Sequence, residues 1–135
     1  MKTTNYFNTF LEVADDCPVD EAEIPPERGR KTIVRMQYEM ISENPYEYTS
    51  DDVIFNVFAM KHDVPKNNRD EEREQFFSKG RACLRSSSLG KRYGWGIHYD
   101  EDGKMALFEV ESSKYQELAN NENLNHLKAM RSGKP

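Results

Sequence analysis

The chain has 135 residues, the length of one ordinary domain, and its formal net charge at pH 7 is −5. Without a net positive charge the chain lacks the usual basis of nucleic-acid affinity, which argues against a nucleic-acid partner. No apolar run approaches the roughly 18 residues of a membrane span, and residues 1–5 show no secretory signal, so we expect one cytoplasmic domain over residues 1–135 with a frayed tail at 131–135.

The first half of the chain predicts a strand, a long loop and a helix. Apolar and polar residues alternate over residues 5–14, and this period of two indicates a strand. Residues 15–31 contain prolines and a glycine without apolar periodicity, which predicts an irregular loop. From Thr32 the apolar spacing becomes helical and stops at Asn44-Pro45, so we expect an amphipathic helix capped by Thr32.

Two further helices are expected between residues 49 and 80. Thr49 and Ser50 precede acids and a broad apolar face, which predicts a helix that begins there and ends near Pro65. Asn68 can cap a third, shorter helix, whose first turn is acidic and whose end is marked by Gly80.

The remaining residues predict strands and a last helix. Residues 81–86 alternate like a strand, and residues 93–110 predict a β-hairpin around an Asp-Gly turn. A capping box at Ser113 begins a helix through Ala119, which residues 124–130 are expected to continue after an Asn-rich break. The predicted fold is α+β: an antiparallel sheet of about four strands with helices packed on one face, in the order β-α-α-α-β-β-β-α.

The cysteine and histidine positions indicate no cofactor and no metal site. Cys17 and Cys83 lie far apart and form no C-x-x-C pair, so we interpret both as buried free thiols. His62, His98 and His126 show none of the spacings that predict a zinc ligand set.

Charge is distributed unevenly, and this asymmetry is the main indication of function. Residues 12–27 hold seven acids and no Lys or Arg, whereas residues 75–99 hold no acid. The connection 85–96 combines serines, glycines, cations and aromatic rings, which can bind a phosphate or carboxylate through backbone N–H groups and guanidinium forks. The leading hypothesis is a small anionic ligand bound by Arg81, Arg85, Lys91, Arg92, Trp95 and His98.

Three other interpretations stay open. The connection can be purely structural, with Gly94 and Gly96 allowing a neighbouring element to approach the sheet closely. The acidic and basic segments can instead recognise a protein partner or form a homo-oligomer. An enzyme using Asp16, Cys17 and His98 is the third, and it requires the first and third strands to be neighbours so that thiol and imidazole meet.

Three segments of the chain form a distinctive set of motifs: N-Y-x-x-T-F at residues 5–10, E-V-A-x-D-C-P at 12–18 and K-R-Y-G-W-G-I-H at 91–98. Together they resemble a family of small bacterial proteins known only as a domain of unknown function, and the likeness extends over nearly the whole chain. The resemblance implies a bacterial source and a stand-alone domain. It supplies no substrate, cofactor or catalytic residue.

Overall fold

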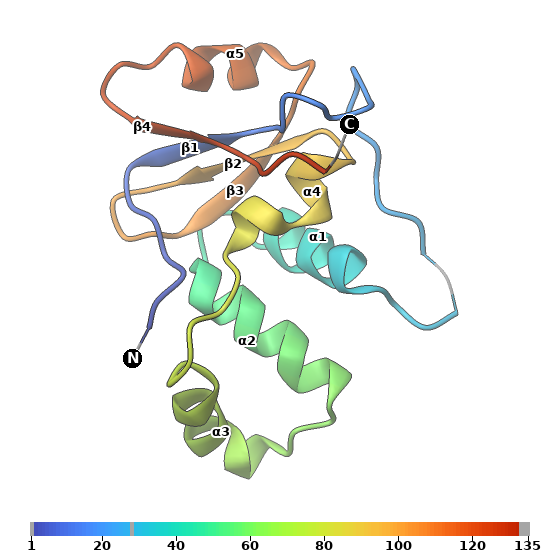
Figure 1. Cartoon of the computed structure of the whole chain (residues 1–135), viewed down its shortest axis with the longest axis vertical. Helices are drawn as coiled ribbons and strands as arrows, with labels where there is room; N and C mark the ends of the chain where they lie inside the picture. Colours follow the sequence, from blue (N-terminus) through green and yellow to red (C-terminus); the bar gives the residue numbers. More distant parts are fainter. Residues whose placement is uncertain (1, 28, 133–135) are drawn as a thin grey trace.

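A four-stranded sheet lies at the centre of the molecule (Figure 1). The computed structural model describes residues 2–27 and 29–132, so residues 133–135 of the expected frayed tail lie outside the described part. The strand order is β3-β2-β1-β4; the pairs β3-β2 and β2-β1 are antiparallel and the pair β1-β4 is parallel. The strands are β1 (Thr9–Glu12), β2 (Trp95–Tyr99), β3 (Met105–Glu109) and β4 (Asn125–Lys128).

Five α-helices and two short 3₁₀ turns accompany the sheet in the described residues. None of these helices is long and apolar enough to cross a lipid bilayer. The helices are α1 (Ile33–Glu43), α2 (Ser50–Lys61), α3 (Arg69–Phe76), α4 (Ser88–Lys91) and α5 (Ser113–Ala119), and the 3₁₀ turns are η1 (Lys66–Asn68) and η2 (Leu84–Ser86).

Helices cover both faces of the sheet, because neighbouring residues of β1 are buried on opposite sides. Leu11 packs with residues of α1, α2, α4 and β2 in the main core. Phe10 packs on the other face against Tyr115 and Leu118 of α5, and Figure 1 shows α5 across the sheet from α1 and α2. The α+β class and the four strands are confirmed, while the sheet is mixed and α5 lies apart from the other helices.

The helix starts follow the predicted capping chemistry. Thr32 accepts a hydrogen bond from the N–H of Arg35 at the start of α1. Thr49 and Asp52 form a reciprocal capping box at the start of α2, since each side chain accepts from the other's N–H. Helix α5 is capped by Ser112, one residue before the predicted position.

The predicted hairpin is confirmed as β2 and β3. The turn between them is held by the carboxylate of Asp100, which accepts from the N–H groups of Asp102 and Lys104. Trp95, Ile97 and Tyr99 share the face toward the main core, as the alternation predicted.

The prediction of a strand at residues 81–86 was wrong. Leu84–Ser86 form the 3₁₀ turn η2, and α4 follows at once. Ser86 Oγ donates to the carbonyl of Cys83 and Ser87 Oγ accepts from the N–H of Leu89. Such local side-chain bonds stabilise turns and helix starts at the expense of an extended strand.

The predicted helical continuation through residues 124–130 was also wrong, because residues 125–128 form β4. The N–H groups of Asn125 and Ala129 donate to the carbonyls of Asn8 and Glu12, beside β1. The leucine spacing in this segment fits a helix, but pairing with a strand more than a hundred residues away decides its conformation.

Neighbouring elements approach the chain closely at Gly94 and Gly96. A Cβ on Gly96 would lie 2.6 Å from the ring of Tyr115 and 2.8 Å from that of Phe10, and one on Gly94 would lie 2.9 Å from Val19. Neighbouring elements therefore fill the space over both glycines, as the structural interpretation of this segment expected.

We predict that Gly96→Ala destabilises the fold by about 1–3 kcal/mol, because the added methyl group overpacks the Phe10 and Tyr115 rings. Gly29→Ala is the matched control, since a Cβ there meets nothing within 4 Å. Urea unfolding of both variants measures the difference. Equal urea midpoints for the two variants would show that the interface with α5 accommodates the added methyl group without loss of stability.

Candidate functional site

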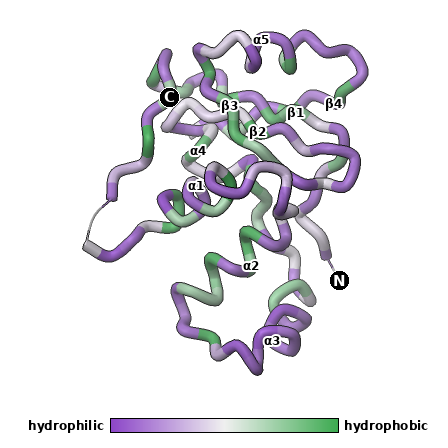
Figure 2. Tube along the Cα trace, turned by 180° about the vertical axis from the view of Figure 1, so that it is seen from behind, coloured by the Kyte–Doolittle hydropathy of each residue, from purple (hydrophilic) through white to green (hydrophobic). Residues whose placement is uncertain are grey.

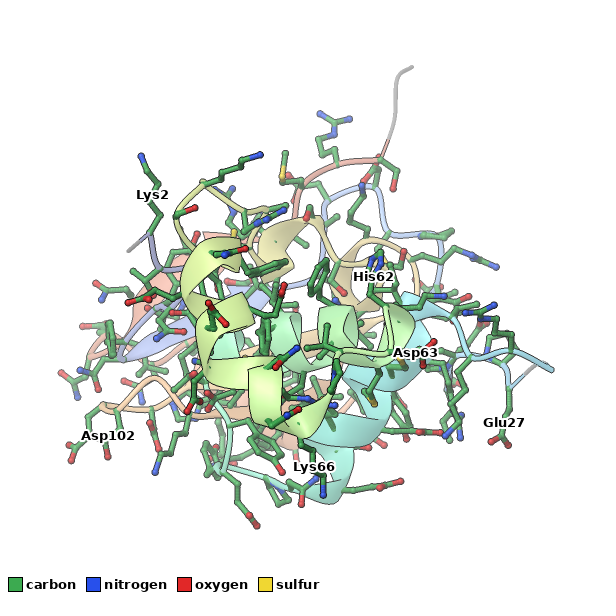
Figure 3. All side chains as sticks on the ribbon, turned by 90° about the horizontal axis from the view of Figure 1, so that it is seen from below. Lys2, Glu27, His62, Asp63, Lys66 and Asp102 are labelled. Carbon is green, nitrogen blue, oxygen red and sulfur yellow. The ribbon has the colours of Figure 1, made fainter. Side chains whose placement is uncertain are left out.

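A cleft opens between α1, α2, the end of α3 and the segment 82–88. Its volume is about 660 Å³, in the range typical of small-molecule sites. Figure 3 looks onto α2 and α3, with His62 labelled at the C-terminal end of α2. Most of the wall is apolar and includes Ile33, Val34, Ile54, Val57, Phe58 and Leu84.

A few polar groups interrupt this apolar wall. Ser87 Oγ donates to Oε1 of Gln37 at 2.6 Å and accepts from the N–H of Leu89, so it joins α1 to the start of α4. The His62 ring stacks on Phe58, with 4.4 Å between the ring centroids. Because Gln37 and Ser87 are buried and bonded to each other, this part of the wall is fixed before any ligand arrives.

A second cavity of about 440 Å³ shares two aromatic wall residues, Phe58 and Phe76, with the cleft. Glu72, Gln75, Ser78, Lys79 and Arg81 provide its polar lining. The cleft and the second cavity are therefore adjacent. The cleft is largely apolar, and the second cavity is lined by two cations, Lys79 and Arg81.

Arg81 is held firmly at this junction. Its Nε donates to the carbonyl of Phe76 at 2.7 Å, and its guanidinium carbon lies 3.9 Å from the centroid of the Phe76 ring. Among the described residues, none accepts a hydrogen bond from its terminal nitrogens. A stacked guanidinium with two free N–H₂ groups is well suited to a carboxylate or phosphate.

The other predicted cations lie elsewhere. Arg85 Nε donates to the carbonyl of Lys128, the last residue of β4. Arg92 is exposed, with its guanidinium carbon 5.3 Å from the centroid of the Tyr93 ring. Lys91 ends α4, and none of these three residues lines the cleft or the adjoining cavity.

Trp95 and His98 also lie apart, on opposite faces of β2. The Trp95 indole N–H donates to the carbonyl of Glu23, and its ring packs on Tyr38. His98 Nδ1 lies 2.8 Å from the Tyr46 hydroxyl. Of the six predicted ligand-binding residues, the structure brings only Arg81 to one of the two cavities.

Asp16, Cys17 and His98 are not brought together, although β1 and β2 are neighbours. His98 pairs with Phe10 in the sheet register, whereas Cys17 follows a turn that starts from Ala14. At about 3.3 Å per extended residue, Ala14 lies roughly 13 Å along the chain from Phe10. In the described part of the chain, no group of three or more His, Cys, Asp or Glu side chains is arranged to hold a metal ion.

The acidic and basic segments meet through backbone groups. The N–H of Glu23 donates to the carbonyl of Tyr93 at 2.8 Å. Of the ion pairs formed by residues that the structure describes, none joins residues 12–27 to residues 75–99. Most of these charges therefore stay at the surface without a partner from the other segment, as exposed charge runs commonly do.

Sequence reasoning missed Phe58, Phe76 and Lys79 as site residues. Phe58 belonged only to the broad apolar face expected for the second helix, and Phe76 was given no role. A signal was present in the composition of α3, which is hydrophilic along most of its length (Figure 2). A helix with so few apolar residues cannot cover the broad apolar face of α2, so part of that face is left to line a cleft.

We predict that His98 makes the fold less stable in acid. Burial lowers the pKa of His98, the nearby Asp100 raises it and Lys114 lowers it further, and the net direction is downward. The unfolded chain therefore takes up a proton near pH 6.5 that the folded chain resists, and stability is lost as pH falls through this range. The free energy of unfolding of the wild type should fall relative to that of His98→Gln between pH 7 and pH 5, and parallel curves would contradict this.

Comparison with known proteins identifies a family but no function. No curated protein and no solved structure matches the chain. The model of a family of unknown function (DUF6157) matches residues 1–135. The chain therefore belongs to this family of unknown function.

Proposed function

We propose that the protein binds a small molecule that has an apolar body and one carboxylate or phosphate group. The observation that carries this proposal is the shared aromatic wall, Phe58 and Phe76, between an apolar cleft and a cavity that carries Lys79 and Arg81. The proposal keeps the small anion and Arg81 of the sequence hypothesis. It places the ligand beside α2 and α3 instead of along the connection 85–96.

The apolar body of the ligand would lie along α2. Ile54, Val57 and Phe58 face the cleft from this helix, and Ile33 at its mouth is 52% exposed. Burial of such a surface contributes a favourable free energy of about 25 cal/mol per Å² of apolar area, so this wall would supply most of the affinity. The polar edge at Ser86 and Ser88 would orient the ligand without excluding an apolar chain or ring.

The anionic group would bind Arg81. Stacking on Phe76 and the bond from Nε hold the guanidinium in one orientation, so little side-chain entropy is lost when an anion binds. Lys79 lines the same cavity and adds a second positive charge, while Glu72, also in the lining, disfavours highly charged ligands. A single carboxylate or phosphate group therefore fits better than a polyphosphate.

We predict that carboxylates and phosphate monoesters with apolar chains or rings stabilise the protein more than the matching alcohols do. A ligand at about a hundred times its dissociation constant should add roughly 2.7 kcal/mol to the free energy of unfolding. Arg81→Ala should weaken binding about 10- to 100-fold, the loss expected for charged hydrogen bonds of about 1.5–3 kcal/mol. Thermal shift and calorimetric titration measure both effects.

Arg92→Ala is the matched control, because Arg92 is also exposed and stacked on an aromatic ring but lies outside both cavities. It should bind the acids as the wild type does. Equal weakening in both arginine variants, or equal affinity for acids and alcohols, would rule out Arg81 as the anion site. The two unpaired cysteines are consistent with a reducing cytoplasm as the place of this function.

A second candidate is self-association through the acidic and basic segments, favoured by the lack of ion pairs between them among the described residues. We expect light scattering to find a dimer at low salt and a monomer at high salt, since exposed charges are screened by ions. A monomer under both conditions, together with a response to acids, would leave ligand binding as the function.

A further inference from the structure

A thiol and two phenol groups form a cluster behind the cleft. Cys83 lines the cleft, and its Sγ lies 3.2 Å from the hydroxyl of Tyr6 in a hydrogen bond. The Tyr6 ring meets the Tyr99 ring edge-on, with 5.5 Å between their centroids. Three segments far apart in sequence thus bring the side chains of Tyr6, Cys83 and Tyr99 together.

The hydroxyl of Tyr99 is the unusual member of this cluster. Tyr99 is fully buried, and its hydroxyl has no hydrogen-bond partner among the described residues. Burial raises the pKa of Tyr99 well above its usual value, and neighbouring Cys83 and Tyr6 raise it further. A buried hydroxyl without a partner costs free energy, and an oxygen atom added to the sulfur of this cluster would offer the Tyr99 hydroxyl an acceptor.

We propose that Cys83 is a peroxide-sensitive thiol whose sulfenic acid is stabilised by the hydroxyls of Tyr6 and Tyr99. The Cys83 thiolate attacks one oxygen of a hydroperoxide, the S–O bond forms as the O–O bond breaks, and the leaving oxygen takes a proton to become water or an alcohol. The sulfur is oxidised by two electrons and the peroxide is reduced by two. The new oxygen accepts hydrogen bonds from the two phenols.

Access and a neighbouring phenol both favour Cys83 for this reaction. The cleft gives a small peroxide a route to the half-buried sulfur. Burial and Cys83 raise the pKa of the Tyr6 phenol, and nearby Arg85 opposes them only in part. The phenol beside the sulfur therefore keeps its proton and can donate a hydrogen bond to the new oxygen.

The surroundings also favour a sulfenic acid that persists. Cys83 bonds to Tyr6, which precedes β1, whereas Cys17 follows a turn that starts from Ala14, beyond the other end of β1. The described part of the chain therefore holds no second thiol close enough to convert the sulfenic acid to a disulfide. This inference does not depend on the proposed ligand.

The test uses the full chain as Cys17→Ser and Cys83→Ser variants, so that each retains one cysteine. Each is treated with hydrogen peroxide and then with a dicarbonyl probe specific for sulfenic acid, and intact mass measures the labelled fraction. We expect at least tenfold more labelling when Cys83 is the cysteine present. Equal labelling of the two variants, or none at Cys83, would overturn the proposal.

Tyr6→Phe and Tyr99→Phe, made in the Cys17→Ser background, test the role of the phenols. When the probe is added after a delay, each change should reduce the labelled fraction severalfold relative to its parent, and the doubly oxidised sulfinic acid should increase. Tyr93→Phe is the control, since the Tyr93 ring lies beside Arg92 and, among the described residues, no hydrogen bond or ring contact joins it to Cys83, Tyr6 or Tyr99. If Tyr99→Phe fails to fold, the Tyr6→Phe variant alone tests the role of the phenols. A sulfenic acid that persists as long in Tyr6→Phe as in its parent would contradict stabilisation by the cluster.

Discussion

Strand β1 is the constraint on which the other elements depend. It is hydrogen-bonded along both edges, to β2 and β4, and it is buried on both faces. Phe10 and Leu11 are consequently buried by different helices. Helix α5 packs over Phe10, and helices α1 and α2 pack over Leu11. The short turn η2 and α4 then fit against the edge that β4 completes, where Arg85 bonds to the backbone of β4.

The cleft exists because α2 is anchored at one end and poorly covered at the other. At its N-terminal end Asp51 is buried and accepts hydrogen bonds from Thr4 and Thr3, which ties the start of the chain to the helix. At its C-terminal end the small cluster around Phe76 packs against it. Cys83 lines the same cleft as the proposed ligand site, so a bound ligand should change the accessibility of the Cys83 thiol.

Sequence patterns were sufficient wherever the stabilising contacts are local. Thr32 and Thr49 cap their helices through bonds to residues three positions away, and the Asp100 turn closes within four residues. The candidate site was less predictable. Uneven charge pointed to the region that contains Arg81, but nothing in the spacing of the cations showed that Arg85 and Arg92 would be separated from it, because η2 and α4 turn the chain between them.

By itself the sequence determined the α+β class, the hairpin, three helix starts and membership of a family without an assigned function. These features rest on period, capping and turn chemistry over a few residues. Only the tertiary structure decided that residues 125–128 form a strand, that Phe58 and Phe76 line two adjacent cavities, and that Tyr6 contacts both Cys83 and Tyr99. Each of these depends on contacts between distant segments, whose energy outweighs local propensity and leaves no periodic trace in the sequence.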